Sequence, residues 1–207
     1  MASTIQVDKI TDVGGNTIIS SNGSGTFTSN LPASAPNVST ATGTLPIANG
    51  GTGAATLAAA GLANTPSFHI RKSSNQTGLS SGGWTKVTFD DEVFDTDSAF
   101  ASDKFTAPSD GKYFFTSAAK INDGGTNTLV GSGMRFTING AIAAEEIHFM
   151  VNGSNSAEGK SVTAVLNLTA SQYVEVYAYA QDNGGAACSI TGGTDRDTFF
   201  MGFKLIG

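Results

Sequence analysis

Few residues of the 207-residue chain have the types and spacing that catalysis needs. The only histidines, His69 and His148, each lie in a segment with a strand pattern, and neither belongs to a catalytic or metal-binding motif. Glu145 and Glu146 are adjacent, so on a strand their side chains face opposite sides and cannot act as a carboxylate pair. The single cysteine, Cys188, lies in a glycine-rich stretch with no histidine beside it, which disfavours a catalytic thiol and excludes an intrachain disulfide.

Phosphate-binding and nucleophile-elbow motifs are also missing from the sequence. The segment GGTGAAT, residues 50–56, lacks the lysine of a phosphate-binding loop, and no Gly-x-Ser-x-Gly motif occurs. An enzyme needs a convergent set of titratable groups, and this chain offers none. The sequence therefore predicts a protein that is not an enzyme, with no cofactor and no metal site.

Polar side chains that could bind a ligand are concentrated in loops. The segment QDNGGAACSITGGTDRD, residues 181–197, joins the last two predicted strands and is rich in Gly, Asn and Asp. Loops at the rim of a rigid β-sandwich commonly carry binding specificity, although a plain connector explains this segment equally well. The loops NDGGTNTLVGSG, residues 122–133, and NGSNSAEG, residues 152–159, invite the same hypothesis. The candidate ligand-binding residues are Asp123, Asn127, Asn152, Asn155, Asp182, Asn183, Asp195 and Arg196.

The elements that would position these loops are short alternating segments separated by turn signals, from about Ser67 onward. This pattern is typical of an antiparallel β-sandwich, and no long helical period occurs in this half. Asn139-Gly140 between two of the segments is a strong signal for a two-residue hairpin. The predicted strands are residues 67–72, 84–89, 104–107, 112–121, 133–138, 141–151, 160–168, 173–181 and 197–206.

The first half of the chain has a different composition, which changes near Thr65-Pro66. Phe27 is its only aromatic residue, so residues 1–65 lack the large side chains of an independent core. Residues 1–30 contain two strand-like stretches, TIQVDKITD and GNTIISS, and are interpreted as an N-terminal anchor. Two such strands alone are marginally stable in water, so we expect this anchor to need a partner.

Residues 31–65 are interpreted as a linker followed by a short stalk. The Pro, Ser and Thr-rich tract is either a flexible linker or a segment that is ordered only against other chains. The ten-residue stretch AATLAAAGLA, residues 54–63, has high helix propensity but is too short to persist as an isolated helix. Three copies around an axis would bury Leu57 and Leu62 together, which predicts a trimerising helix.

Several predicted strands are apolar on both faces, which a two-layer sandwich by itself does not require. In KYFFTSAA, residues 112–119, alternate aromatic side chains point to opposite sides. One face can form the internal core, and another copy of the chain is the simplest cover for the other. The tyrosines of YVEVYAYA, residues 173–180, suit either such an interface or the edge of the sandwich. The candidate residues for the trimer interface or the core are Leu57, Leu62, Tyr113, Phe115, Tyr177, Tyr179, Phe199 and Phe203.

The charge balance excludes some classes of partner. The formal net charge is -6 and the basic residues do not cluster, whereas general affinity for nucleic acids or anionic membranes requires a basic patch. The opening residues MASTIQVDKITD lack the pattern of a secretory signal. No apolar run approaches the ~20 residues that span a bilayer. We therefore expect a soluble product of the cytosol that neither binds nucleic acid nor inserts into a membrane.

Residues 67–207 resemble a known family. FTAPSDGKYFF, residues 105–115, resembles the Phe-Thr-x-Pro-x-x-Gly-x-Tyr-x-Phe signature of the globular head of complement component 1q. MRFTINGAI is similar to the central hairpin of that family, and SVTAVLNL, YVEVYAYA and TFFMGFKLI are similar to its last strands, in order. The resemblance implies an all-β, antiparallel jelly-roll head of the tumour-necrosis-factor type that forms a homotrimer. Ser171-Gln172 stands where the family usually has Gly-Asp, so the family's loop chemistry there does not transfer.

The first half resembles proteins of a different kind. MASTIQVDKITDVGGNTI resembles the opening of many bacteriophage structural proteins, and IANGGTGAATLAAAGL is similar to the Gly-Gly-Thr-Gly repeat of phage tail fibres. Together the resemblances imply a virion protein made in the host cytoplasm, a trimeric tail-fibre or spike knob that docks on another virion protein through residues 1–30. We expect its loops to recognise a glycan or protein of the host surface. A capsid head fibre or decoration protein, which braces the capsid or adheres to its surroundings, stays open as the alternative.

Overall fold

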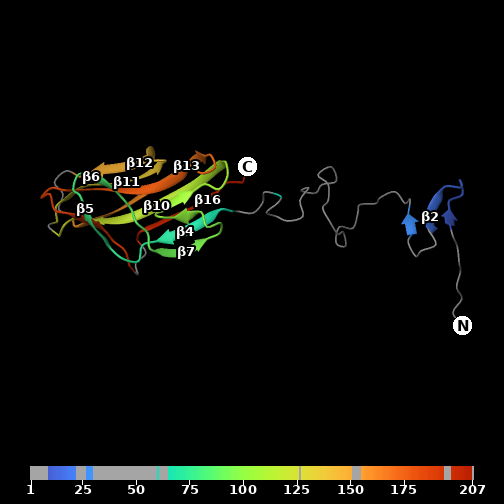
Figure 1. Cartoon of the computed structure of the whole chain (residues 1–207), viewed down its shortest axis with the longest axis horizontal. Coiled ribbons are helices and arrows are strands. Elements are labelled where there is room, and N and C mark those ends of the chain that lie inside the picture. Colours follow the sequence, from blue (N-terminus) through green and yellow to red (C-terminus); the bar gives the residue numbers. More distant parts are fainter. Residues whose placement is uncertain are drawn as a thin grey trace, which may run out of the picture. The chain divides into compact units, whose positions relative to one another are not determined.

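The structure of the chain, a computed structural model, describes residues 9–21, 27–29, 60, 65–125, 127–150, 155–193 and 197–206 (Figure 1). Contacts between Cα atoms divide the chain into two units, Met1–Ala55 and Thr56–Gly207. Leu57 and Leu62 of the predicted trimerising helix lie outside the described residues, and only Ala60 of that segment is described. The described part of the chain contains no helix long and apolar enough to cross a membrane.

The first unit contains a small antiparallel sheet in the order β1-β2-β3. Its strands are β1 (Lys9–Thr11), β2 (Thr17–Ser21) and β3 (Phe27–Ser29). Between β1 and β2 the carboxylate of Asp12 accepts hydrogen bonds from the backbone and side-chain amides of Asn16, at 2.7 and 2.9 Å. The hydrogen bond from the side chain of Asn16 is the main reason that the pKa of Asp12 is lowered. Strands β1 and β2 lie within the two predicted stretches, and β3 adds a third, while the anchoring role stays a prediction.

The second unit contains a two-sheet antiparallel sandwich, residues 67–206, which we call the head. All of its regular elements among the described residues are strands, so the all-β prediction is confirmed. The strands are β4 (Ser67–Arg71), β5 (Gln76–Leu79), β6 (Gly83–Lys86), β7 (Asp91–Asp95), β8 (Phe100–Ala101), β9 (Lys104–Thr106), β10 (Gly111–Asn122), β11 (Leu129–Ile138), β12 (Ala141–Phe149), β13 (Ala157–Leu168), β14 (Tyr173–Asp182), β15 (Cys188–Ile190) and β16 (Phe199–Lys204).

The strands of the head alternate between the two sheets. One sheet, called the β10 sheet, has the order β5-β15-β10-β16-β4-β7, and β13 also pairs with β10. The other, called the β14 sheet, has the order β12-β11-β14-β9-β8, and β6 also pairs with β14. The chain thus passes from β10 to the hairpin β11-β12 in the opposite sheet, returns to β13, crosses to β14 and returns to β16. This interleaved order is that of a jelly roll.

The hairpin between β11 and β12 turns at Asn139 and Gly140. Both residues have positive φ, 50° and 84°, and Ile138 pairs directly with Ala141. Positive φ at both central residues is the mark of a type I′ turn, whose twist matches that of the flanking strands. The two-residue hairpin predicted from the Asn-Gly pair is therefore confirmed.

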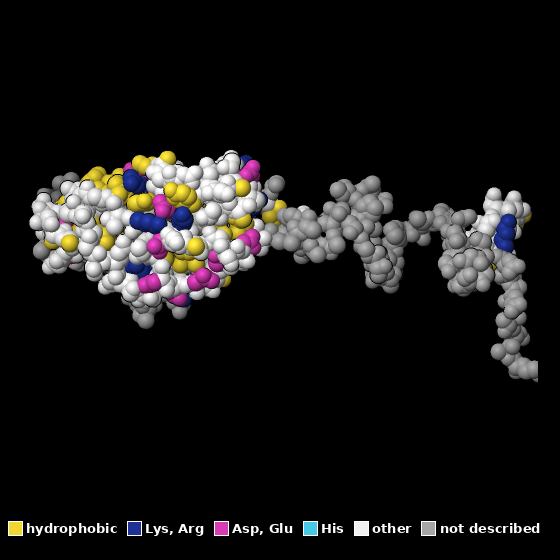
Figure 2. All heavy atoms as spheres, in the orientation of Figure 1, with side chains coloured by type: hydrophobic (Ala, Val, Ile, Leu, Met, Phe, Trp, Pro, Cys, Tyr) yellow, Lys and Arg dark blue, Asp and Glu magenta, His cyan; other side chains and the backbone are white. Residues whose placement is uncertain are grey.

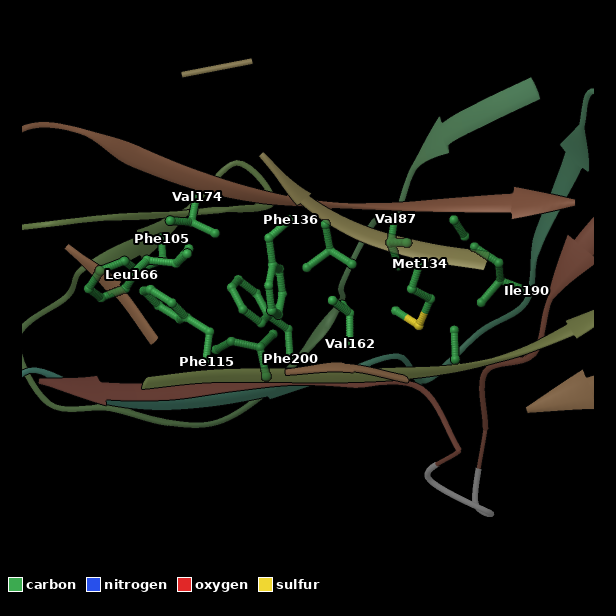
Figure 3. Packing of buried hydrophobic residues seen from close by; sticks show 14 of the residues in the cluster. Val87, Phe105, Phe115, Met134, Phe136, Val162, Leu166, Val174, Ile190 and Phe200 are labelled. Atoms are coloured by element: carbon green, nitrogen blue, oxygen red, sulfur yellow. The ribbon is translucent and has the colours of Figure 1, made fainter. Parts of the chain in front are cut away.

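The core of the head fills the space between the two sheets (Figure 3). Along β10 and β14 every second residue is buried, as the alternating geometry of a strand requires. Aromatic rings dominate the packing, and Phe115, which is 0% exposed, contacts the rings of Phe105 and Phe200 at centroid distances of 5.2 and 5.8 Å. The hydroxyl of buried Tyr113 donates a hydrogen bond of 2.6 Å to the carbonyl oxygen of Ser109. Tyr113 and Phe115 are thus core residues rather than interface residues.

Candidate functional site

The rim loops that the sequence marked as ligand-binding lie together at one end of the head. The backbone amide of Asn183 donates to the carbonyl of Thr128 at 2.9 Å, and that of Leu129 donates to the carbonyl of Asn155 at 3.1 Å. These bonds join the loop after β10, the segment before β13 and the loop after β14. Asp123, Asn127, Asn155, Asp182 and Asn183 belong to this group of loops, and Asn152, Asp195 and Arg196 lie outside the described residues.

The two rim carboxylates are turned inward and stabilise the loops. Asp123, 8% exposed, accepts hydrogen bonds from the backbone amides of Gly125 and Thr128 at 3.0 and 3.1 Å. Asp182, 4% exposed, accepts bonds from the Thr128 hydroxyl at 2.6 Å and from the Ala186 amide at 3.0 Å. A buried carboxylate that binds several donors of its own chain fixes the loop instead of facing solvent. Ligand binding by Asp123 and Asp182 stays a prediction, and in this structure both carboxylates bind donors of their own loops.

The outer face of the β10 sheet carries many apolar side chains, and we call it the β10 face. Tyr113, Phe115 and Ser117 point inward, so the alternate residues of β10 and their neighbours in register point outward. The three rows that cross the sheet are Val165, Phe114, Phe203 and Ser67; Thr163, Thr116, Met201, His69 and Phe94; and Ser161, Ala118, Phe199, Arg71 and Asp91.

Charge in these three rows is confined to one edge, whereas the outward rows on either side of them carry Lys112 and Lys120. Arg71 and Asp91 form an ion pair of 2.7 Å, and no other side chain in the three rows is an acid, a lysine or an arginine. Burial is the main cause that lowers the pKa of His69, and the neighbouring Arg71 lowers it further, so the imidazole is neutral at pH 7. Val165 and Phe94, at opposite ends of the face, are 56% and 45% exposed. Hydrophobic side chains also reach the surface of the head in several places in Figure 2.

Hollows mark the β10 face and its margins, including one of about 410 Å³ beside Lys112 and Asn167. His69, Arg71, Phe199 and Met201 line another of about 200 Å³. A third, of about 400 Å³, lies where β10 meets β13. Its lining residues include Ala118, Lys120, Gly159, Lys160 and Asp197. A hollowed apolar face with few charges can receive the side chains of another protein surface.

The outer face of the β14 sheet, called the β14 face, has a different character because it combines rings with paired charges. The guanidinium carbon of Arg135 lies 4.4 Å from the ring centroid of Trp84 and 5.3 Å from that of Tyr177. One nitrogen of Arg135 lies 3.7 Å from a carboxylate oxygen of Glu145. The rings of Trp84 and Tyr179 are 5.4 Å apart. Tyr177 and Tyr179, both predicted as interface residues, therefore belong to this face rather than to the β10 face.

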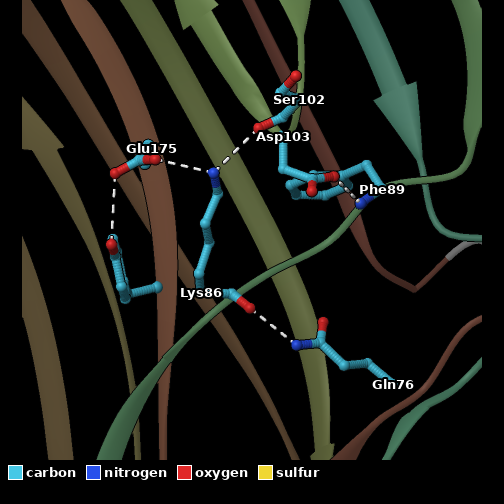
Figure 4. Close-up of polar contacts among 7 residues, drawn as sticks. Gln76, Lys86, Phe89, Ser102, Asp103 and Glu175 are labelled. Atoms are coloured by element: carbon cyan, nitrogen blue, oxygen red, sulfur yellow. Dashed lines mark hydrogen bonds and ion pairs between the residues drawn. The ribbon is translucent and has the colours of Figure 1, made fainter.

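Lys86 of β6 joins β14 and the turn between β8 and β9 beside this cluster (Figure 4). Its ammonium group donates to Glu175 at 2.8 Å and to the carbonyl oxygen of Ser102 at 3.0 Å. The hydroxyl of Tyr177 donates to the other oxygen of Glu175 at 3.3 Å. Burial, followed by the negative charge of Glu175, raises the pKa of Tyr177, so its hydroxyl stays protonated in neutral solution.

Sequence reasoning missed Trp84 and Arg135 as members of a common cluster. They are distant in sequence, and only the pairing of β6 and β11 with β14 brings them together. The sequence did contain one signal. In GSGMRFTI an arginine stands at an outward position, and the other residues are apolar or have small side chains. Among the described residues, no group of three or more His, Cys, Asp or Glu side chains could hold a metal ion.

Cys188 is a buried residue of β15, next to β5 and at the end of the β10 sheet. Burial, followed by the negative charges of Asp182 and Asp123, raises the pKa of its thiol. A thiol whose pKa is raised is a poor nucleophile at neutral pH, so its environment favours a packing role.

The open side between the two sheets is closed by charged side chains of β12 and β13. Glu158 accepts a bond from the Ser132 hydroxyl and lies 2.9 Å from the ammonium group of Lys160 and 3.3 Å from Nδ1 of His148. Lys160 also lies 3.6 Å from a carboxylate oxygen of Glu146. Burial acts to raise the pKa of Glu158, but the bonds from Ser132 and Lys160 outweigh it and hold this pKa below 4.5.

The network at Glu158 predicts a specific loss of stability in acid. A carboxyl whose pKa is lowered by folding stabilises the folded state above its unfolded pKa, and this contribution disappears as the pH falls through its folded pKa. We expect the free energy of unfolding to fall between about pH 5 and about pH 3, and less steeply in Glu158→Gln. Glu92→Gln, which changes an exposed carboxylate on β7, should leave the slope of the free energy of unfolding against pH unchanged. Equal slopes for Glu158→Gln and the parent protein, measured by urea unfolding, would contradict this account.

The sequence comparisons leave the chain without a family assignment, since no family model and no curated protein matches it. Solved structures do match. The globular domain of zebrafish complement 1qA has 18% identity and a TM-score of 0.47, over 68% of this chain and 98% of that chain. Murine APRIL has 15% identity and a TM-score of 0.47, over 67% of this chain and 98% of that chain. The jelly-roll description of the head rests on its strand order.

Proposed function

We propose that the chain is a homotrimeric structural protein of a phage virion, in which the head is the distal knob of a tail fibre or spike and recognises the host surface. Residues 1–30 would dock on another virion protein. The proposal rests on the resemblance of the first 65 residues to phage appendage proteins and on the apolar β10 face of the head.

The β10 face is the observation that carries this proposal. Its three rows place Phe94, Phe114, Phe199, Met201 and Phe203 on one outer face, with a single ion pair at the edge. An apolar face of this kind is costly in water, and covering it with another copy of the chain removes that cost. Self-association therefore explains why β10 and β16 carry aromatic residues on both of their sides.

A threefold ring needs a second surface on each copy, because a ring of three is built from head-to-tail contacts. The edge strand β12 offers one near its hairpin end, where Ile142 is 60% exposed. Contact between the β10 face of one copy and the β12 edge of the next would close the ring. This arrangement leaves β6 and most of β14 facing outward.

The rim supports a binding or structural role rather than a catalytic one. Asp123 and Asp182 are occupied in holding their loops, as described above. Three heads on one stalk would present three identical surfaces, so that weak contacts with a host cell act together. Recognition by such a knob does not require tight binding at any single surface.

Two measurements test the proposal. Light scattering of the full chain should give three times the chain mass of 21.0 kDa. Antibody against the head should label the tips of tail fibres or spikes on intact particles. A stable mass of 21.0 kDa would overturn the trimer. Label on the capsid would replace the tail position with the head-fibre or decoration role.

A further inference from the structure

We propose that the β14 face binds a neutral carbohydrate on the rings of Trp84 and Tyr179. This inference deepens the host-recognition role and rests on it for its biological meaning. The surface that recognises the host would then be the outer face of the β14 sheet and not the rim loops, whose carboxylates are turned inward. The strand pairing places Trp84 directly beside Tyr179 and Lys86 beside Tyr177, so the rings and the polar groups alternate along the face.

The rings form a rigid, partly exposed surface. Trp84, Tyr177 and Tyr179 are each partly exposed, and the ring planes of Trp84 and Tyr179 meet at 53°. Arg135 stacks on Trp84 at 4.4 Å, and Phe149 contacts the edge of Tyr179 at 5.8 Å. Contacts of this kind hold each ring in place, so little conformational entropy remains to be lost when a ligand binds.

Two glycines of β11 allow this arrangement. Gly133 pairs with Tyr179, and a Cβ atom at Gly133 would lie 2.7 Å from the carbonyl oxygen of Glu146. At Gly131 a Cβ atom would lie 3.0 Å from the ring of Phe149. Side chains at these positions would displace the neighbouring strand or the Phe149 ring. Strand β11 therefore contributes no side chain at these two positions, and the rings of Tyr179 and Phe149 on its two sides lie close to the sheet.

Hydrogen-bonding groups surround the rings in fixed positions. The hydroxyl of Tyr179 donates to the side-chain oxygen of Gln181 at 2.9 Å, which leaves the amide NH2 of Gln181 as a further donor group. Glu175 is held by Lys86 and by Tyr177. A sugar has an apolar ring face that packs on an aromatic ring and hydroxyls at its rim that bond to such groups. The β14 face provides both kinds of contact side by side.

The charges of this face indicate a neutral ligand. Lys86 is paired with Glu175 and Arg135 with Glu145, so the two cations are balanced by two anions. A phosphate-rich or sulfated ligand would have to displace these carboxylates, and the chain as a whole carries a net charge of -6. The same pairing disfavours an apolar protein partner, because its contact would remove both ion pairs from water without replacing their hydration.

The single tryptophan of the chain is Trp84, so its fluorescence reports on the proposed site directly. The full-length protein is titrated with neutral oligosaccharides of glucose, galactose and mannose, and with a sialylated oligosaccharide and heparin as charged probes. We expect a saturable change of tryptophan emission with at least one neutral probe. Tyr179→Ala, which keeps Trp84 but removes the neighbouring ring, should weaken binding about tenfold.

Two further variants establish whether the rings of the β14 face bind the probe. Tyr173→Ala removes a ring at the far end of β14, where Lys104 lies 4.6 Å from it, and should leave the affinity unchanged. Gln181→Ala serves as a second site variant if Tyr179→Ala fails to unfold cooperatively, and it should also weaken binding. A response to the charged probes alone, no saturable response, or equal affinities of the site variants and the parent protein would overturn the inference. Light scattering of the same samples separates the two proposals, because a trimer that binds no neutral probe overturns only this one.

Discussion

Replacement of Phe115 by alanine is expected to lower the free energy of unfolding of the head by about 3 to 5 kcal/mol. Phe115 is 0% exposed, and its ring contacts Phe105, Phe136 and Phe200 at centroid distances of 5.2, 6.1 and 5.8 Å. A Cβ atom at Gly202 would lie 2.5 Å from this ring, so the backbone of β16 already fills the space on that side. Strands β10 and β16 therefore cannot move closer together to fill the cavity that the Phe115→Ala change leaves. The lost contacts of the ring are not replaced.

The measurement is equilibrium unfolding in guanidinium chloride, followed by far-UV circular dichroism. Phe94→Ala is the matched control, because the same side chain is removed where it is 45% exposed. We expect the control to change the free energy of unfolding by less than about 1 kcal/mol in the dissociated protein. Similar losses for the two variants would show that the core is not arranged as described.

Placing aspartate at both ends of the β10 face, in the double variant Val165→Asp with Phe94→Asp, is expected to dissociate the trimer without unfolding the head. The two side chains are 56% and 45% exposed in a single copy, so the folded subunit can tolerate the charges. In an interface each charge would be buried without a partner, which costs about 3 kcal/mol or more. Light scattering should therefore fall to the chain mass of 21.0 kDa.

Tyr173→Asp controls for the added charge, since it places an aspartate on the opposite outer face, at the start of β14. It should leave the mass of the assembly unchanged. Circular dichroism of all variants establishes that the strands are retained. A double variant that keeps three copies together would exclude the β10 face as the shared surface, and the assembly would then have to use another one.

Alternating apolar residues made the long strands of the head predictable from the sequence. In β10 and β14 each second side chain enters the core, and the Asn139-Gly140 turn fixes the hairpin between β11 and β12. The two-residue strand β8, which pairs with β9, was missed, and so were β5, β7 and β15, since QTGL, DEVFD and CSI are short or polar. The last three strands form because β10, β15 and β4 offer them a paired edge, which is a tertiary effect that local sequence does not contain.

The candidate sites were less predictable than the fold for a definite reason. Sequence identifies an aspartate in a loop but not the direction in which its carboxylate points, and at Asp123 and Asp182 the nearest backbone amides bind it. Clusters that form across strands also escape sequence patterns. Arg135 of β11 contacts Trp84 of β6 only because both strands pair with β14. Outward-facing rings on β14 were predicted, but the face to which they belong follows from the pairing.

The charged side chains around Glu158 have a consequence for solubility. Strands β12 and β13 lie at sheet edges, and a long edge strand can add a strand from a foreign chain and so start aggregation. The network of Glu158, Lys160 and Glu146 lies between these two edges. An incoming strand would have to strip water from those ions before it could pair. The same contacts that close the sandwich thus hinder the growth of fibrils from these two edges.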